Sequence, residues 1–256
     1  MGFQHLVFAA HTDIGRKRLR NEDAILAMPE YGVFCVADGM GGAQGGEMAS
    51  RAVIDALRQV LVRRDDREAT LDSTRVQIAL AIEEASQTIR RRAAEHGFRG
   101  AGTTAVVLAF DARDPSRAAA FHAGDSRLYR FRERMLDQIT HDHSFAAAIG
   151  YRDPSCLPGL FRNLVTRAIG FDDGVEMEET SFEVRPRDLL LLCSDGLTNM
   201  LPDARLAAIL AAQSPDDFTR LPHILVDQAN QAGGADNISV IAVQVGSSIT
   251  TYAEKN

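Results

Sequence analysis

The sequence predicts an α+β fold in which antiparallel sheets are covered by helices. Short apolar runs bounded by Gly, Asp or Pro indicate buried strands, and apolar residues at helical spacing indicate long amphipathic helices. The elements follow one another as strands, two helices, several strands, two helices and a last strand. Because this order lacks the strict strand-helix alternation of a parallel doubly wound sheet, we expect the sheets to be antiparallel.

The predicted strands are rich in Val, Leu, Ile, Phe and Ala, which pack well in a sheet that is covered on its faces. Each run is short and is bounded by a turn-forming residue such as Gly, Asp or Pro. The runs cover residues 33–37, 103–110, 117–121, 189–193 and 238–245.

Two long helices are predicted between the first two strands. Apolar residues recur at helical spacing from Ala49 to Leu61 and again from Ile78 to Ala93. Two more helices are expected over about residues 203–212 and 217–232, and the second should end at the following glycine pair, a good helix stop.

Residues 150–170 are the least regular stretch of the chain. They contain Pro154, Pro158 and Gly159 and follow neither the helical nor the strand period. We expect a loop that covers a site as a flap, although an ordinary surface connection would give the same pattern.

Length and apolar content predict a single domain. A chain of 256 residues that is 45% apolar can bury one substantial core. We expect this domain to fill residues 1–256, with its core over about 4–245, an irregular flap over about 144–170 and a polar tail over 246–256.

Composition also excludes several classes of partner. The 28 basic and 35 acidic residues give a net charge of -7, with acids interleaved among the arginines, so we expect no nucleic-acid partner. No apolar stretch approaches the ~20 residues that cross a membrane, and the amino terminus does not resemble an export signal. The three cysteines, an odd number, predict reduced thiols in a cytoplasmic protein. We also expect a monomer with no membrane partner.

Four aspartates stand where apolar runs meet glycine or small polar residues, and they are Asp38, Asp125, Asp195 and Asp236. One such residue alone is more typical of a turn hydrogen bond than of catalysis. Four of them favour convergence, and carboxylates about 4 Å apart repel each other by roughly 1 kcal/mol per pair even in water. Cations would offset that repulsion, and hard oxygen ligands select Mg or Mn.

A second polar cluster lies near the amino terminus, over Thr12–Asp23. It combines arginines with two acids, and Arg can bind a phosphate through two parallel hydrogen bonds. Alone, this cluster is more typical of a solvated polar turn. Together with the four aspartates it favours a site for a phosphate and metal ions.

These residues fall into six short motifs whose order resembles that of the metal-dependent PP2C (PPM) serine/threonine phosphatases in their bacterial form. The likeness runs over about residues 4–245. Each motif alone is weak because Asp-Gly pairs are common, but six in the family's order make a strong joint signal. The motifs are Thr12–Asp23, Val36–Gly42, Gly102–Thr104, Gly124–Arg127, Leu192–Leu197 and Ala235–Ser239.

The resemblance implies an α-β-β-α sandwich of two antiparallel sheets between helix pairs, with the acids gathered at one end. Asp38 should then bridge two metal ions, Mn or Mg. The Gly39 carbonyl should bind one of these ions, and Asp195 and Asp236 should bind the other.

The remaining site residues are carried over from the same motifs. Glu22 and Asp23 should hold metal-bound waters, and Asp125 should bind a third, weaker ion together with the Asp195 carboxylate. Arg18 should receive the substrate phosphate, while Asn237 should orient Asp236 or a water.

The activity that the resemblance implies is hydrolysis of phosphoserine and phosphothreonine in proteins by a metal-activated water, without a phosphoenzyme. The substrates should be phosphoproteins made by a bacterial Ser/Thr kinase. A link to a secretion apparatus is a further hypothesis that rests on the overall resemblance and on no particular residue. Eukaryotic members have a histidine where this chain has Met40, so the general acid is open. A metal-bound water or another histidine brought near by folding are the candidates. We interpret His141 and His143 first as capping and packing residues, with a catalytic role as the minor alternative.

Three alternatives compete with this interpretation. Cys156 and Arg162 have the Cys-x5-Arg spacing of thiolate phosphatases, but Pro158 between them has no amide hydrogen for a phosphate. The glycine-rich stretch 39–46 fits neither a dinucleotide loop nor a P-loop. The third alternative is a regulatory module that binds a phosphoprotein without hydrolysis, and the intact metal carboxylates argue against it.

Overall fold

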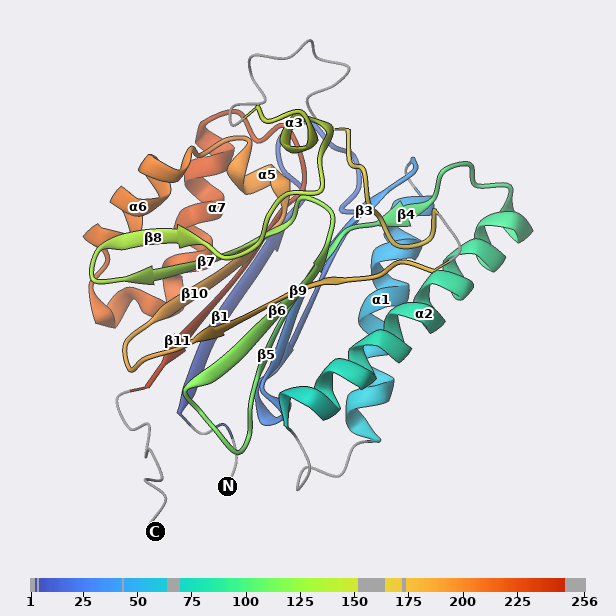
Figure 1. Cartoon of the computed structure of the whole chain (residues 1–256). Coiled ribbons are helices and arrows are strands. Elements are labelled where there is room, and N and C mark those ends of the chain that lie inside the picture. Colours follow the sequence, from blue (N-terminus) through green and yellow to red (C-terminus); the bar gives the residue numbers. More distant parts are fainter. Residues whose placement is uncertain are drawn as a thin grey trace.

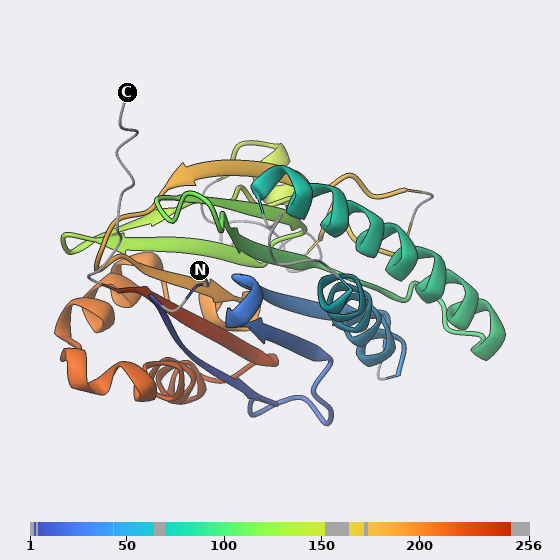
Figure 2. The ribbon, with the colours of Figure 1, turned by 90° about the horizontal axis from the view of Figure 1, so that it is seen from below.

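Two antiparallel sheets stack face to face between two layers of helices (Figure 1). The layers are seen from below in Figure 2, with one helix pair on each outer side. This computed structural model describes residues 3, 5–42, 44–63, 70–151, 164–171 and 174–246. The arrangement confirms the predicted α+β sandwich.

The first sheet has five strands, and every pairing in it is antiparallel. Its two longest strands, β1 and β11, pair along their whole length, from Leu6 opposite Val245 to Asp13 opposite Ile238. In spatial order the strands are β1 (Leu6–Asp13), β11 (Ile238–Val245), β10 (Leu189–Cys193), β7 (Arg127–Arg132) and β8 (Met135–Gln138).

The second sheet has six strands and is antiparallel throughout. A short strand, β4 (Gly102–Thr103), pairs with the end of β3 beside the main path. Along that path the strands are β2 (Asp23–Met28), β3 (Val33–Met40), β5 (Ala105–Phe110), β6 (Arg117–Ala123) and β9 (Glu178–Glu183).

Helices α1 (Gly45–Val62) and α2 (Leu71–His96) cover the second sheet. The Thr70 hydroxyl accepts the Ser73 N–H at the start of α2, and Gly97, with φ of 70°, ends the helix. The first sheet is covered by α6 (Asp203–Ala212) and α7 (Leu221–Gln231). The remaining helical elements are short, and they are η1 (Pro29–Tyr31), α3 (Phe145–Ala148), α5 (Asp195–Thr198) and η4 (Pro215–Arg220).

The central strands read as continuous apolar runs because both of their faces are buried. In β10, Leu190 and Leu192 face the core between the sheets, whereas Leu191 and Cys193 pack under α6 and α7. The same alternation divides β3 between the two cores. A strand buried on both faces shows no polar alternation, which is why these runs could be predicted from apolar content alone.

The sequence missed the strands with an exposed face. β9 reads Glu-Glu-Thr-Ser-Phe-Glu and is an edge strand of its sheet. β7 reads Arg-Leu-Tyr-Arg-Phe-Arg and lies next to the edge strand β8, and four of its six residues are only partly buried. Polar residues are common on such edges, where they discourage pairing with other chains. β1, β2 and β8 were missed for the same reason, since few of their residues are fully buried.

Two predicted boundaries shift. The run 103–110 divides into β4 and β5 because the Thr104 N–H donates to the Asp38 carbonyl, at 2.8 Å, outside the regular ladder. The last helix begins at Leu221, after the 3₁₀ turn η4, and not near residue 217. The helix predicted over 203–212 coincides with α6.

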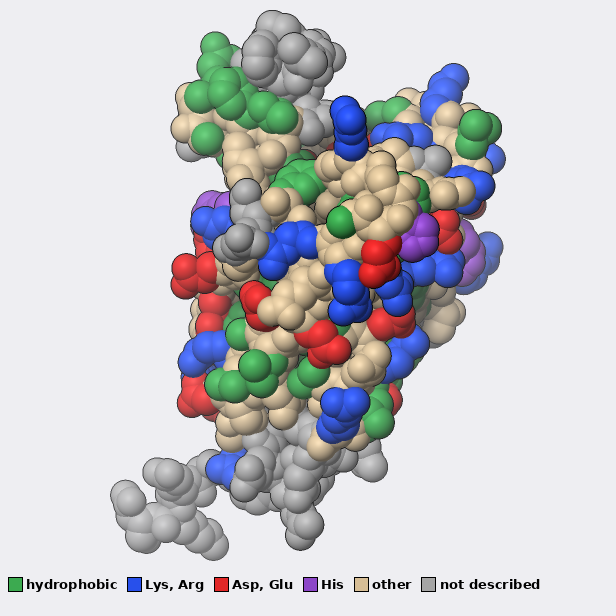
Figure 3. All heavy atoms as spheres, turned by 90° about the vertical axis from the view of Figure 1, so that its right-hand side faces the viewer, with side chains coloured by type: hydrophobic (Ala, Val, Ile, Leu, Met, Phe, Trp, Pro, Cys, Tyr) green, Lys and Arg blue, Asp and Glu red, His purple; other side chains and the backbone are tan. Residues whose placement is uncertain are grey.

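Several predictions concern residues outside the described part of the chain, namely Cys156, Arg162, residues 152–163 of the flap and the tail beyond residue 246. The described remainder of the flap pairs with neighbours, since Ser144 bridges Val165 and Thr103 bridges Ile169. None of the helices in the described ranges has the length and apolar content that a membrane crossing requires. Seen from the side of α1 and α2, the surface carries Lys and Arg side chains interspersed with Asp and Glu (Figure 3).

Candidate active site

A cavity of about 580 Å³ opens at the end of the sandwich where β3 and β10 finish and β11 begins. Every predicted site residue except Asp23 lines it. These lining residues are Arg18, Glu22, Asp38, Gly39, Asp125, Asp195, Asp236 and Asn237.

Strand pairing brings together acids that lie far apart in the sequence. Asp38, near the end of β3, pairs with Asp23 at the start of β2. Asp195 lies two residues after β10 and opens α5, while Asp236 lies two residues before β11. Because β10 and β11 are antiparallel neighbours, the end of one lies beside the beginning of the other.

Burial and mutual repulsion raise the pKa values of Asp38, Asp195 and Asp23. Burial raises the pKa of Asp38 well above its usual range, and the neighbouring aspartates raise it further. Burial also raises the pKa of Asp195 to about 6 and that of Asp23 to about 7. A buried cluster of this kind favours protonated acids unless cations balance the charge.

Two carboxylate oxygens in the cluster have no hydrogen-bond partner among the residues that the structure describes. They are Asp23 Oδ1 and Asp195 Oδ1, and both are buried. Burying such an oxygen without a partner costs free energy. The available donors are carboxylates and the Gly39 carbonyl, a hard oxygen set suited to Mg or Mn. The residues present therefore fit the metal ions that the resemblance implies.

Comparison with known proteins decides the family. The family model described as Protein phosphatase 2C matches residues 14–229. The chain belongs to the protein phosphatase 2C family. It is a metal-dependent protein phosphatase of the bacterial type, as the sequence motifs predicted.

Individual relatives agree over nearly the full chain. Protein phosphatase PhpP of Streptococcus pneumoniae is 32% identical over 243 residues, which cover 91% of this chain and 95% of that protein. The structure of PppA, a regulatory component of T6SS in Pseudomonas aeruginosa, superposes with a TM-score of 0.82 at 32% identity and covers 94% and 98% of the two chains. The catalytic domain of PstP in complex with two manganese ions superposes with a TM-score of 0.78 at 30% identity, covering 94% of this chain and 98% of that one.

In the phosphatase, Asp23 lies at the edge of the acid cluster and not in the cavity lining. Its Oδ2 accepts the Ser194 hydroxyl at 2.8 Å, and its charge is the largest influence after burial on the pKa of Asp38. No role was predicted for Ser194, although Ser194 stands inside the motif around Asp195. Its hydroxyl also accepts the Ser239 N–H at 3.0 Å, which ties β10 to β11.

Thr104 is a second residue whose role was not predicted. It lines the cavity, and its hydroxyl accepts the Asp38 N–H at 3.4 Å and hydrogen-bonds Ser126 at 2.7 Å. Thr104 could have been identified as a candidate site residue, because it belongs to the motif Gly102–Thr104. These contacts hold the backbone of Asp38 and the turn that carries Asp125 at a fixed separation.

Asn237 anchors the loop that carries Arg18. Its buried side-chain amide donates to the carbonyls of Ile14 and Arg20, both at 2.9 Å, and accepts the Glu22 N–H at 2.8 Å. Asn237 contacts Asp236 through its backbone, because the Asn237 N–H donates to Asp236 at 2.8 Å. Its predicted role in orienting Asp236 or a water stays a prediction. The side chain fixes both ends of the loop.

Arg18 lies at the rim and pairs with Asp236 at 2.6 Å. This hydrogen bond raises the pKa of the Arg18 guanidinium, whose side chain is 52% exposed. The predicted phosphate-binding arginine thus faces the cavity from a loop held at both ends.

Replacing Asn237 with Ala should lower the free energy of unfolding by about 2–3 kcal/mol, because three hydrogen bonds are lost and buried backbone groups lose their partner. It should also raise KM for a phosphorylated substrate, since the Arg18 loop loses its anchors. Asn237→Asp keeps the acceptor for Glu22 but loses both donors, so its effect should be intermediate. Urea unfolding and steady-state kinetics test the series, and a variant with wild-type stability and KM would contradict it.

The turn of Gly39 depends on glycine because the backbone of α1 approaches closely. A Cβ at Gly39 would lie 2.2 Å from the Gly46 carbonyl oxygen. The Gly39 N–H donates to the Glu22 carbonyl at 3.2 Å. Gly39 therefore sits in contact with two neighbouring segments and lines the cavity, while the use of its carbonyl by a metal stays a prediction.

The described cysteines are not suited to nucleophilic catalysis. Cys35 and Cys193 are both free and buried. Burial raises the pKa of Cys193 to about 12 and also raises that of Cys35, so neither thiol ionises near neutral pH. Cys156 lies outside the described residues.

Proposed function

We propose that the phosphatase hydrolyses phosphoserine and phosphothreonine in proteins with a water activated at a binuclear Mn²⁺ or Mg²⁺ centre, without a phosphoenzyme. The observation that carries this proposal is the convergence of Asp38, Asp195 and Asp236 on one cavity, with buried acid oxygens that lack partners in the described part of the chain. When bound, the ions supply the activated water and offset charge on the phosphoryl group.

Each acid has a proposed part in holding the ions. Asp38 would hold both ions of the pair, the Gly39 carbonyl would bind one of them, and Asp195 and Asp236 would bind the other. Glu22 and Asp23 act through waters, and Asp125 serves a third, weaker ion. Burial also raises the pKa of Glu22 and that of Asp125, in keeping with acids that need a cation nearby.

Arg18 binds the substrate phosphate in this proposal. Its side chain is half exposed at the cavity rim, so it can turn from Asp236 toward the phosphate oxygens. Guanidinium N–H groups bind phosphate in parallel pairs, which orients the phosphorus for in-line attack. Met40 lines the same cavity and has no proton to give, so water in the cavity protonates the departing serine or threonine oxygen.

The proposed substrates are phosphoproteins made by a bacterial Ser/Thr kinase that this cytoplasmic enzyme opposes. The likeness to PppA, a regulatory component of T6SS, supports a setting beside a secretion apparatus. Comparing phosphoproteomes before and after deletion of the gene tests this role. Phosphoserine and phosphothreonine should accumulate, and an unchanged phosphoproteome would contradict it.

Chelation and thiol modification should have opposite effects on activity. Excess EDTA should abolish hydrolysis of p-nitrophenyl phosphate and of a phosphothreonine peptide, and Mn²⁺ should restore both. A thiol reagent should leave most of the activity, because the described thiols are buried with raised pKa values.

The converse pattern would overturn the metal mechanism and favour a thiolate nucleophile. No turnover with any divalent cation would favour the phosphoprotein-binding module. Measuring both substrates in the same buffer separates loss of the centre from loss of protein recognition.

A further inference from the structure

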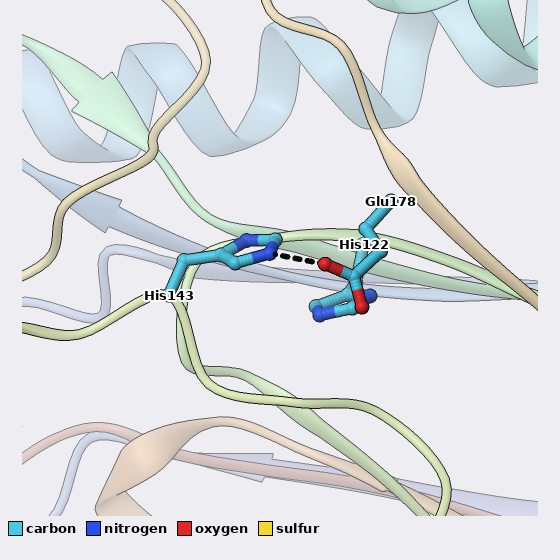
Figure 4. Close-up of side chains that lie close together, drawn as sticks. All are labelled: His122, His143 and Glu178. Atoms are coloured by element: carbon cyan, nitrogen blue, oxygen red, sulfur yellow. Dashed lines mark hydrogen bonds and ion pairs between the residues drawn. The ribbon is translucent and has the colours of Figure 1, made fainter. Parts of the chain in front are cut away.

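Three side chains gather behind the turn that carries Asp125, and the proposed centre does not use them. His122 comes from β6, Glu178 from β9, and His143 from the segment before α3 (Figure 4). One nitrogen of each histidine and a Glu178 oxygen lie within 4.8 Å of one another. Such a group raises the question of a further metal site.

The ring geometry argues against a metal. The His122 and His143 rings stack with centroids 4.5 Å apart and planes only 6° from parallel. A metal bound in the plane of one ring at about 2.0–2.1 Å would lie well outside the plane of the other, where the lone pair does not point. The stacked pair needs another explanation, and the hydrogen bonds supply one.

Those hydrogen bonds fix the tautomer of His143. The Gly124 N–H donates to His143 Nδ1 at 3.2 Å, so that nitrogen accepts and carries no proton. Nε2 then carries the proton and donates to Glu178 Oε2 at 3.0 Å, the contact drawn in Figure 4. Glu178 therefore selects the form of His143 that can receive the Gly124 N–H.

The His143 backbone holds the same glycine from its other side. Its N–H donates to the Gly124 carbonyl at 2.9 Å, and its own carbonyl accepts the Thr166 N–H at 2.8 Å. Gly124 needs this support, because its φ is +109° and a Cβ there would lie 2.5 Å from the Thr104 side chain. Both polar backbone groups of Gly124 are thus bound by one residue, immediately before Asp125.

We propose that His143, oriented by Glu178, is a positioning residue that holds the Gly124–Asp125 turn so that Asp125 faces the cavity. The proposal rests on the proposed role of Asp125 at a third, weaker ion. His143 also links that turn to Thr166, whose neighbour Val165 lines the cavity. His143 touches no reacting atom and acts through the turn alone.

Two substitutions of His143 separate this role from simple packing. His143→Asn can place an amide oxygen where Nδ1 lies and keep the Gly124 bond, whereas His143→Gln can reach Glu178 but leaves Gly124 without an acceptor. Mn²⁺ binding is followed by the electron paramagnetic resonance of free Mn²⁺. We expect His143→Gln to weaken the weakest binding phase by about tenfold and spare the tight phases, as loss of a supporting hydrogen bond does. His143→Asn should restore the weak phase.

Glu178 offers a second route if a His143 variant folds poorly. Glu178→Gln keeps an acceptor for the His143 Nε2–H, so this variant should bind Mn²⁺ like the wild type. Glu178→Leu removes that acceptor, so the proton of His143 is no longer held on Nε2, and the weakest phase of Mn²⁺ binding should weaken. His96→Gln, on the exposed end of α2, is the matched control and should change nothing.

Asp125→Asn distinguishes the possible failures. If Asp125→Asn leaves the weak phase intact, the role of Asp125 fails and the proposal fails with it. If Asp125→Asn removes the weak phase but His143→Gln and Glu178→Leu do not, the proposal alone is overturned. An equal loss in His143→Asn and His143→Gln would also overturn it, because packing would then explain both.

Discussion

Replacing Asp38 with Asn is expected to lower kcat for Mn²⁺-dependent hydrolysis by at least about 10³-fold, or about 4 kcal/mol of barrier. The amide has nearly the same shape but cannot bridge two cations as a carboxylate does. Asp38 is partly buried near the end of β3, and burial together with four neighbouring aspartates raises its pKa. Its replacement therefore removes the acid on which the proposed centre depends most.

The same substitution should leave the fold intact. Without metal, Asp38→Asn removes one buried acid from a repelling cluster, so its melting temperature in EDTA should equal or exceed that of the wild type. The Mn²⁺-induced rise in melting temperature should be much smaller than in the wild type.

Asp137→Asn is the matched control. Asp137 lies on the edge strand β8 and pairs with Arg130 with its side chain 43% exposed, so its loss should change kcat by less than about twofold. Hydrolysis by Asp38→Asn within tenfold of the wild type would contradict the bridging role.

Much of the site could be predicted because its residues stand at visible breaks in apolar runs. Asp38, Asp195 and Asp236 each adjoin a buried strand, and the resemblance implied that the ends of these strands meet. The cavity contains all three, while their roles at a metal remain predictions. A continuous apolar run marks a strand buried on both faces, so the central strands could be located from composition.

The supporting contacts could not be predicted from the sequence alone. Asn237 holds loop carbonyls more than 200 positions away, and only the pairing of β1 with β11 brings these segments together. The bonds between His143 and Gly124 likewise join segments whose proximity depends on the folded sheets. His143 was predicted to cap and pack, which describes neither its fixed tautomer nor its two bonds to Gly124. Local patterns identify acids and turns, but long-range polar partners require the tertiary structure.

The stabilisation that Mn²⁺ gives the phosphatase should grow as the pH rises from 5 to 7.5. In the metal-free fold the pKa is raised to about 6 for Asp195 and about 7 for Asp23, above the ordinary value of 3.8, and burial raises that of Asp38 further. The folded state therefore binds more protons than the unfolded state in this window. Stability contributed by these acids is present near pH 4 and is lost as the pH rises through their folded pKa values, by several kcal/mol in all.

Metal binding reverses this penalty because cations replace the protons, so binding releases protons and strengthens with pH. Histidines whose pKa is lowered by burial, such as His5 and His122, oppose the acid contribution below about pH 6.5. They contribute equally with and without metal if they lie outside the centre. The difference between urea unfolding curves in Mn²⁺ and in EDTA therefore isolates the acid cluster. A stabilisation by Mn²⁺ that stays constant from pH 5 to 7.5 would contradict this prediction, because the acids would then be ionised before the metal binds. In Asp38→Asn, the stabilisation by Mn²⁺ should depend less on pH than in the wild type.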